Sequence, residues 1–139
     1  MATIKSFEDI ESWKKAREVC KLLGQLIDEG KFKHSFRLIN QIEGSSGSIM
    51  DNIAEGFERG TRAEFIQFLG YSKGSCGELR SQLYRAFDRS FITEKEFEDL
   101  KILVLQTSGL IQNFISYLQN SEVAGVRRSE ERRVGKECW

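Results

Sequence analysis

Residues able to carry out acid–base, nucleophilic or metal chemistry are scarce in this chain of 139 residues, which has one histidine and three cysteines. His34 has no glutamate three positions before it, so the Glu-x-x-His pairs of a di-iron helical bundle are missing. The cysteines and His34 lack the spacing of zinc ligands. No pattern brings His34 together with both a serine and an aspartate in the way that a Ser-His-Asp triad would require. We therefore predict a non-enzymatic protein with no catalytic residue, no metal ligand, no cofactor and no small-molecule substrate.

The glycine–serine stretch "EGSSGSIMDNIAEG", residues 43–56, is a candidate for a phosphate-binding loop. Such a loop follows a strand and continues with Lys-Ser or Lys-Thr, whereas this run continues with Ile49 and Met50. Ile42, Ser46 and Ile49 also keep helical spacing through it. We therefore predict a helix whose small residues allow close contact with a second small-residue zone, "GYSKGSCG" at residues 70–77.

The composition favours an all-helical cytoplasmic protein. The chain has no proline, a residue that breaks helices and that strand-rich folds use in turns. No apolar run reaches the roughly 18 residues of a membrane span, and the start "MATIKSFEDIESWKK" has no apolar signal region. Cysteines without paired spacing predict a reducing cytoplasm, with Cys20 and Cys76 as buried thiols on apolar helical stripes.

Basic residues form modest clusters in a chain whose 21 basic and 21 acidic residues give a net charge of zero. Any nucleic-acid contact would therefore depend on a local patch rather than on bulk charge. The alternative is a mixed, solvated surface, since Glu8, Asp9, Glu11 and Glu18 lie among the first cations. The candidate nucleic-acid contacts are Lys14, Lys15, Arg17, Lys21, Arg59, Arg62, Lys73 and Arg80.

Four amphipathic segments must position these residues. Capping-box patterns begin three of them, at Ser6, Thr61 and Thr93, and apolar residues then recur at three- and four-residue steps. We predict helices over residues 7–29, from 35 to Gly56 or Gly60, over 61–89, and from 93 to beyond 118. Short links between four such helices predict an all-α, antiparallel up-down-up-down four-helix bundle, a single domain over residues 1–122.

Two motifs resemble a known family. They are "Q-I-x6-I-x2-N-I-A-E-G", from Gln41 to Gly56, and "F-x2-F-L-x4-G-S-x2-E-L", from Phe65 to Leu79. With "FEDIESWKKA" near the start, they resemble the four-helix bundle proteins named for the 23S ribosomal RNA intervening sequence, over roughly residues 6–120. The motif residues, which we interpret as structural, are Gln41, Asn52, Ile53, Ala54, Glu55, Gly56, Gly74, Ser75, Glu78 and Leu79.

The resemblance implies an antiparallel bundle that assembles as a ring, commonly a pentamer. A related branch, the accessory protein of diversity-generating retroelements, binds reverse transcriptase and nucleic acid through a basic surface. In the family, basic residues and alanines often follow the Gln-Ile pair that begins the first motif. This chain departs from that pattern, because Gln41 and Ile42 are followed by Glu43, Gly44, Ser45 and Ser46. The polar motif residues Asn52, Glu55, Ser75 and Glu78 could be solvated surface, a hydrogen-bonded cluster that fixes helix register, or a functional contact.

Residues 123–139 are expected to form a disordered tail. From residue 128, "RSEERRVGKEC" resembles one reading frame of a widely used sequencing adapter, and we interpret it as an assembly artefact.

The last predicted helix carries more apolar residues than one core stripe needs. The extra ones are Ile102, Leu103, Leu105, Leu110, Ile115 and Tyr117. We therefore expect a homo-oligomer that serves as a scaffold or interaction module, and the family resemblance implies a pentamer as the first expectation. The alternative is a nucleic-acid-binding accessory protein for a reverse transcriptase or a ribosomal RNA.

Overall fold

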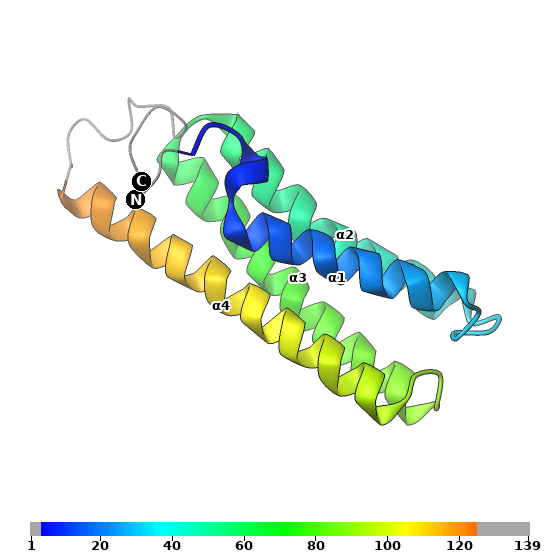
Figure 1. Cartoon of the computed structure of the whole chain (residues 1–139). Helices are drawn as coiled ribbons and strands as arrows, with labels where there is room; N and C mark the ends of the chain where they lie inside the picture. Colours follow the sequence, from blue (N-terminus) through cyan, green and yellow to red (C-terminus); the bar gives the residue numbers. More distant parts are fainter. Residues whose placement is uncertain (1–3, 125–139) are drawn as a thin grey trace.

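The computed structural model describes residues 4–124 and shows four long helices packed side by side (Figure 1). A short 3-10 turn, η1 (Phe7–Asp9), precedes α1 (Glu11–Asp28), α2 (Phe36–Arg59), α3 (Arg62–Asp88) and α4 (Glu94–Ala124). Each helix packs against its neighbour in the chain, and α1 also packs against α4, which closes the bundle. The α1–α2 and α3–α4 links lie at one end (Figure 1). The predicted all-α, antiparallel four-helix bundle is confirmed.

The first helix begins later than its capping pattern predicts. The backbone amides of Lys5 and Ser6 donate to Asp9 at 3.1 and 3.2 Å, so the box caps only the 3-10 turn. Ile10 then has an extended backbone, with ψ of 124°, and α1 starts at Glu11. The extended residue lets the buried Ile10 side chain join the core, which a continuous helix from residue 7 would have oriented differently.

The α2–α3 link is the tightest in the bundle. Gly60 ends α2 with a left-handed φ of 91°, a conformation that glycine adopts without a Cβ clash. Thr61 follows directly, and its hydroxyl accepts the Glu64 amide at 3.2 Å as the N-cap of α3. The predicted capping box at Thr93 is also present, since the Glu96 amide donates to Thr93 Oγ1 and the Thr93 amide donates to Glu96 Oε1.

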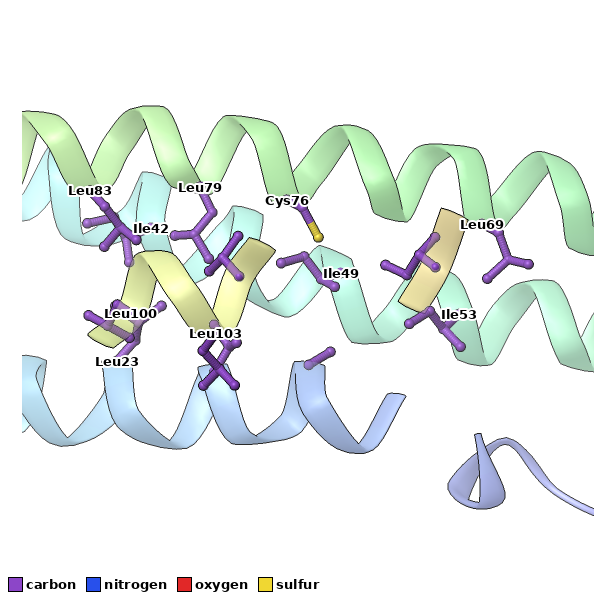
Figure 2. Packing of buried hydrophobic residues seen from close by; sticks show 14 of the residues in the cluster. Leu23, Ile42, Ile49, Ile53, Leu69, Cys76, Leu79, Leu83, Leu100 and Leu103 are labelled. Atoms are coloured by element: carbon purple, nitrogen blue, oxygen red, sulfur yellow. The ribbon is translucent and has the colours of Figure 1, made fainter. Parts of the chain in front are cut away.

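The apolar stripes meet in one core along the bundle axis, as Figure 2 shows for Leu23, Ile49 and Leu79. Cys76 lies in this core, as predicted, whereas Cys20 is only half-buried. Thr107 occupies a buried α4 position because its hydroxyl donates to the Leu103 carbonyl at 2.8 Å.

No helix in the described part of the chain is both long and apolar enough to cross a membrane. The α4 helix runs to Ala124, slightly past the predicted domain boundary at 122. The rest of the predicted tail, including the adapter-like sequence from residue 128, lies outside the described residues.

Candidate functional site

Residues 4–121, whose side chains the structure describes, contain no group of three or more His, Cys, Asp or Glu residues arranged to hold a metal ion. His34 is exposed and its ring lies 5.9 Å from that of Phe36. Burial raises the pKa of Cys76 to about 11, and burial also raises the pKa of Cys20, whose thiol donates to the Ser46 carbonyl. Both thiols are therefore protonated, and so weakly nucleophilic, near neutral pH.

The glycine–serine zone of α2 is continuous helix, and its serines, not its glycines, contact α3. Ser45 Oγ donates to Gln82 Oε1 at 2.6 Å, with both residues buried. From α3, Ser72 Oγ donates to the Ile49 carbonyl at 2.7 Å. Such buried hydrogen bonds fix the position of α3 along α2, because a shift would leave polar atoms without partners.

Three of the polar motif residues make hydrogen bonds along the same two helices, α2 and α3, nearer to the surface of the bundle. Ser75 Oγ donates to Ser48 Oγ at 3.1 Å, and Asn52 Nδ2 donates to the same hydroxyl at 2.8 Å. Arg85 Nη1 donates to Gln41 Oε1 at 2.9 Å. Asn52 and Ser75 thus meet at Ser48, whereas Gln41 bonds separately to Arg85, and these hydrogen bonds form a row along the two helices. For Asn52 and Ser75 this is the second of the three alternatives that the sequence leaves open.

The other motif residues do not join this row. Glu55 lies 3.3 Å from Arg59 of the same helix in an exposed ion pair, and Glu78 is exposed on α3. Ile53 and Leu79 are fully buried. Ala54 is half-buried on α2.

The glycines differ from the close-contact prediction, which is wrong for most of them. A Cβ at Gly56 would lie 2.7 Å from the Phe68 Cβ and 3.1 Å from the Phe65 ring, so α2 and α3 do approach closely there. At the other glycines of the two zones, a Cβ would meet no atom within 4 Å beyond the backbone of its own stretch of helix. Those open positions are Gly44, Gly47, Gly70, Gly74 and Gly77.

On α3 the open glycines belong to an exposed stripe of uncharged, mostly small residues. The stripe follows three- and four-residue steps on the face away from the core. Its members are Ala63, Gln67, Gly70, Gly74, Gly77 and Ser81. No other helix approaches the glycines of this stripe, so the packing of this chain gives no reason for glycine at these positions.

The outer face of α4 is uncharged over most of its length, since no charged residue occurs from 102 to 121. Ile102 and Leu105 are 51% and 43% exposed on this face. The predicted excess of surface apolar residues is smaller than expected, because Leu103 and Ile115 are buried in the core. Leu110 and Tyr117 are half-buried. We call the exposed row Ile102, Leu105, Gly109, Gln112 and Ser116 the α4 outer face.

The candidate nucleic-acid residues do not form one patch. Arg62 is 3% exposed, so the prediction of a surface contact is wrong for it, because its side chain packs into the bundle. Arg59 lies 3.3 Å from Glu55 and 3.4 Å from Glu64, which compensates its charge. Lys14 pairs with Glu11 at 3.1 Å.

The remaining candidates keep cationic surface on two helices. On α1, Arg17 and Lys21 are exposed and Lys15 is half-buried. On α3, Lys73 is exposed and Arg80 is half-buried.

One basic segment was missed by the sequence prediction. Residues 30–42 contain Lys31, Lys33, His34 and Arg37 and no carboxylate. The sequence signal for it is the absence of acidic residues over a run that crosses from the α1–α2 link into α2.

Comparison with known proteins assigns the fold to a family. A solved structure from Bacteroides thetaiotaomicron, described as a protein of unknown function from the S23 ribosomal protein family, superposes with a TM-score of 0.69. It is 22% identical, and the alignment covers 75% of this chain and 97% of that one. No curated protein matches the chain. The family model of the 23S rRNA-intervening sequence protein matches residues 8–113, which span η1 through most of α4, so the chain belongs to that family.

Proposed function

We propose that this protein is a non-enzymatic, cytoplasmic bundle that self-associates through the α4 outer face and serves as a scaffold for other molecules. The observation that carries this proposal is the exposure of Ile102 and Leu105 on a helix face without charge. The first turns of the same helix are highly charged, with Glu94, Glu96 and Glu98 among their residues. Charge therefore disappears from α4 where the exposed apolar residues begin.

The energetics favour an association surface there. A single exposed aliphatic residue on a soluble protein needs no explanation. Two on adjacent turns of an uncharged face are different, because charged residues are depleted from the centres of protein interfaces. The hydrogen-bonding groups of Gln112 and Ser116 extend this face with side chains that cost less to desolvate than charges do.

A ring is the assembly that we propose. A contact between two different faces of successive copies generates a closed ring when its rotation completes a circle. The α4 outer face of one copy and a different face of the next would satisfy this requirement. The family resemblance suggests a pentamer as the stoichiometry.

Size-exclusion chromatography with light scattering on the full chain at micromolar concentration tests the proposal. We expect a homo-oligomer for the parent and a monomer for the double variant Ile102→Asp/Leu105→Asp, with unchanged helical circular dichroism. Leu22→Asp, at a 37% exposed aliphatic position on α1, is the matched control and should keep the parent mass. A parent protein that is monomeric at these concentrations would contradict the proposal.

A second candidate function is nucleic-acid binding in support of a reverse transcriptase or a ribosomal RNA. It is favoured by the exposed face of α1, where Lys14, Arg17 and Lys21 follow helical steps of three and four. A ring would repeat this modest cluster in every subunit and gain affinity by multivalency. Charge reversal at these three residues should weaken RNA binding and leave the oligomer intact. Binding that is unchanged by this variant would remove α1 as the contact.

A further inference from the structure

The bundle end formed by the α1–α2 link and the start of α2 uses its two phenylalanines differently. Phe32 is fully buried and its ring meets Phe91 edge-on, with centroids 6.0 Å apart. Phe36, on the first turn of α2, is 64% exposed, the highest value among the exposed large apolar residues of the described chain. Phe32 therefore anchors the link in the core, whereas most of Phe36 is in solvent, with the His34 ring 5.9 Å from its own.

Two arginines at the end of α3, Arg85 in its last turn and Arg89 directly after it, donate hydrogen bonds near the start of α2. Arg89 Nη1 donates to Ser35 Oγ at 3.0 Å, and Arg85 Nη1 donates to Gln41 Oε1 at 2.9 Å. Both acceptors are neutral oxygens, so these hydrogen bonds position the guanidinium groups without cancelling their charge. Arg59 at the opposite end of α2 differs, because two carboxylates surround it.

Further positive charge flanks Phe36 in the sequence. Lys33 and Arg37 are exposed on either side of Phe36 in the sequence. The first carboxylate of α2 is Glu43, two turns away. Lys31 is the exception, because it pairs with Glu96 at 3.5 Å.

Carboxylates at this end lie outside the first turns of α2, because Asp88 ends α3 beside Arg89, Glu29 follows α1 and Glu94 begins α4. Glu29 and Glu94 line a hollow between the α1–α2 and α3–α4 links, which Lys33 also borders. The first turns of α2 themselves contribute no acid, and Arg85 and Arg89 bring two further cations to them against the single carboxylate of Asp88.

We propose that this surface binds single-stranded nucleic acid, with one base stacked on Phe36 and the neighbouring phosphates held by the surrounding cations. We call it the end patch and define it as Lys33, Phe36, Arg37, Arg85 and Arg89. An aromatic ring stacks with any base, and lysine and arginine side chains follow the phosphate backbone, which is how sequence-tolerant single-strand binders work. A duplex keeps its bases stacked on one another and cannot use the ring in this way.

The open form of the patch favours a strand over a free nucleotide. One exposed ring and one phosphate contact give weak binding, and only a strand engages the ring and several cations together. An anionic membrane is less suited, because stable attachment needs a broad apolar face or a lipid anchor beside the cations. The inference shares its class of partner with the second candidate function, but it depends on different residues and does not depend on self-association.

Fluorescence anisotropy with a labelled uridine oligonucleotide of about 12 nucleotides, within the usual footprint of single-strand binders, tests the end patch on the full chain. Loss of one stacking contact should weaken binding about 5-fold or more in Phe36→Ala, with the salt dependence unchanged. Phe36→Tyr keeps the ring and should bind like the parent. Arg37→Gln should weaken binding and reduce the slope of log K against log salt by about 0.7, the value for one phosphate contact on a single strand.

Tyr71→Ala is the matched control, because Tyr71 is a 51% exposed aromatic on α3 that is not part of the end patch. It should bind like the parent. All variants carry the same full chain, so differences between them arise at the substituted positions.

Three results would overturn the proposal. The first is equal affinity for the parent, Phe36→Ala and Arg37→Gln. The second is binding that only charge reversal at Lys14, Arg17 and Lys21 removes, which would support α1 instead. The third is Phe36-dependent binding to phosphatidylserine vesicles without any binding to the oligonucleotide, which would make the patch a membrane contact.

Discussion

Gly56 and Gly74 have opposite roles, although each belongs to one of the two family motifs. A Cβ at Gly56 would lie 2.7 Å from the Phe68 Cβ, so Gly56→Ala should force α2 and α3 apart and destabilise by about 1–3 kcal/mol. Gly74 has open space around it, so Gly74→Ala should stabilise the helix by up to about 1 kcal/mol. Urea unfolding of both variants beside the parent measures the two effects. Equal stability of the two variants would show that the close approach at Gly56 carries no strain.

Burial of the Cys76 thiol makes part of the stability dependent on alkaline pH. Its pKa rises from an ordinary 9.0 to about 11 in the fold, so the native state retains a proton that the unfolded chain has lost between these values. Stability from this group is therefore fully present below pH 9 and decreases by up to about 2–3 kcal/mol as the pH rises to 11. The variant Cys76→Ala lacks this loss.

Urea unfolding of the parent and of Cys76→Ala from pH 8 to 11 provides the measurement, with Cys138→Ser in both chains as the background. The parent should be more stable at pH 8, because the alanine leaves a cavity. The difference in free energy of unfolding between the parent and Cys76→Ala should become smaller as the pH rises. A constant difference would mean that the thiol ionises equally in both states.

The row of hydrogen bonds between α2 and α3 sets the alignment of these elements. Ser45→Ala leaves Gln82 buried without its partner and should cost about 1–3 kcal/mol. Gln82→Met alone should cost less, and the double variant should recover part of the loss because both polar groups are gone. A double-mutant cycle by thermal unfolding measures the coupling. Additive effects would contradict a direct role for this pair in joining the helices.

Some features of the elements could be predicted from sequence because local chemistry decides them. The capping boxes at Thr61 and Thr93 predicted the start of α3 and α4, since each threonine hydroxyl and the glutamate amide that donates to it lie within one turn. Ser6 has the same pattern, but the chain is extended at the buried Ile10 and only a 3-10 turn forms before it. That outcome depends on tertiary contacts that a short motif does not contain.

The candidate site was less predictable than the elements. Glycine has no side chain to reveal its face, so Gly47 and Gly74 could be located only from the phase of their apolar neighbours. Arg62 begins α3, where a cation is ordinarily solvated, and its burial follows from how the helices meet. The end patch needed the structure, because α2 and the last turns of α3 are far apart in sequence and are joined by side-chain hydrogen bonds.

At the scale of the whole molecule, self-association would link stability to protein concentration. A native state that assembles is stabilised by mass action, so the melting temperature should rise with concentration. The variant Ile102→Asp/Leu105→Asp should melt at one temperature at all concentrations. Calorimetry over a wide concentration range tests this, and a parent melting temperature that is independent of concentration would contradict assembly of the folded state.

The link of Gly60 and Thr61 also has a consequence for the order of folding. The α2–α3 pair closes a shorter loop than the pairs joined through residues 29–35 or 89–93, so it loses less chain entropy and should form in the transition state. In stopped-flow kinetics Gly56→Ala should mainly slow folding, whereas Leu23→Ala on α1 should mainly accelerate unfolding. The reverse pattern would place the nucleus elsewhere. During synthesis the α2–α3 hairpin emerges from the ribosome before α4, so the nascent chain would gain its nucleus before it exposes the surface through which copies meet.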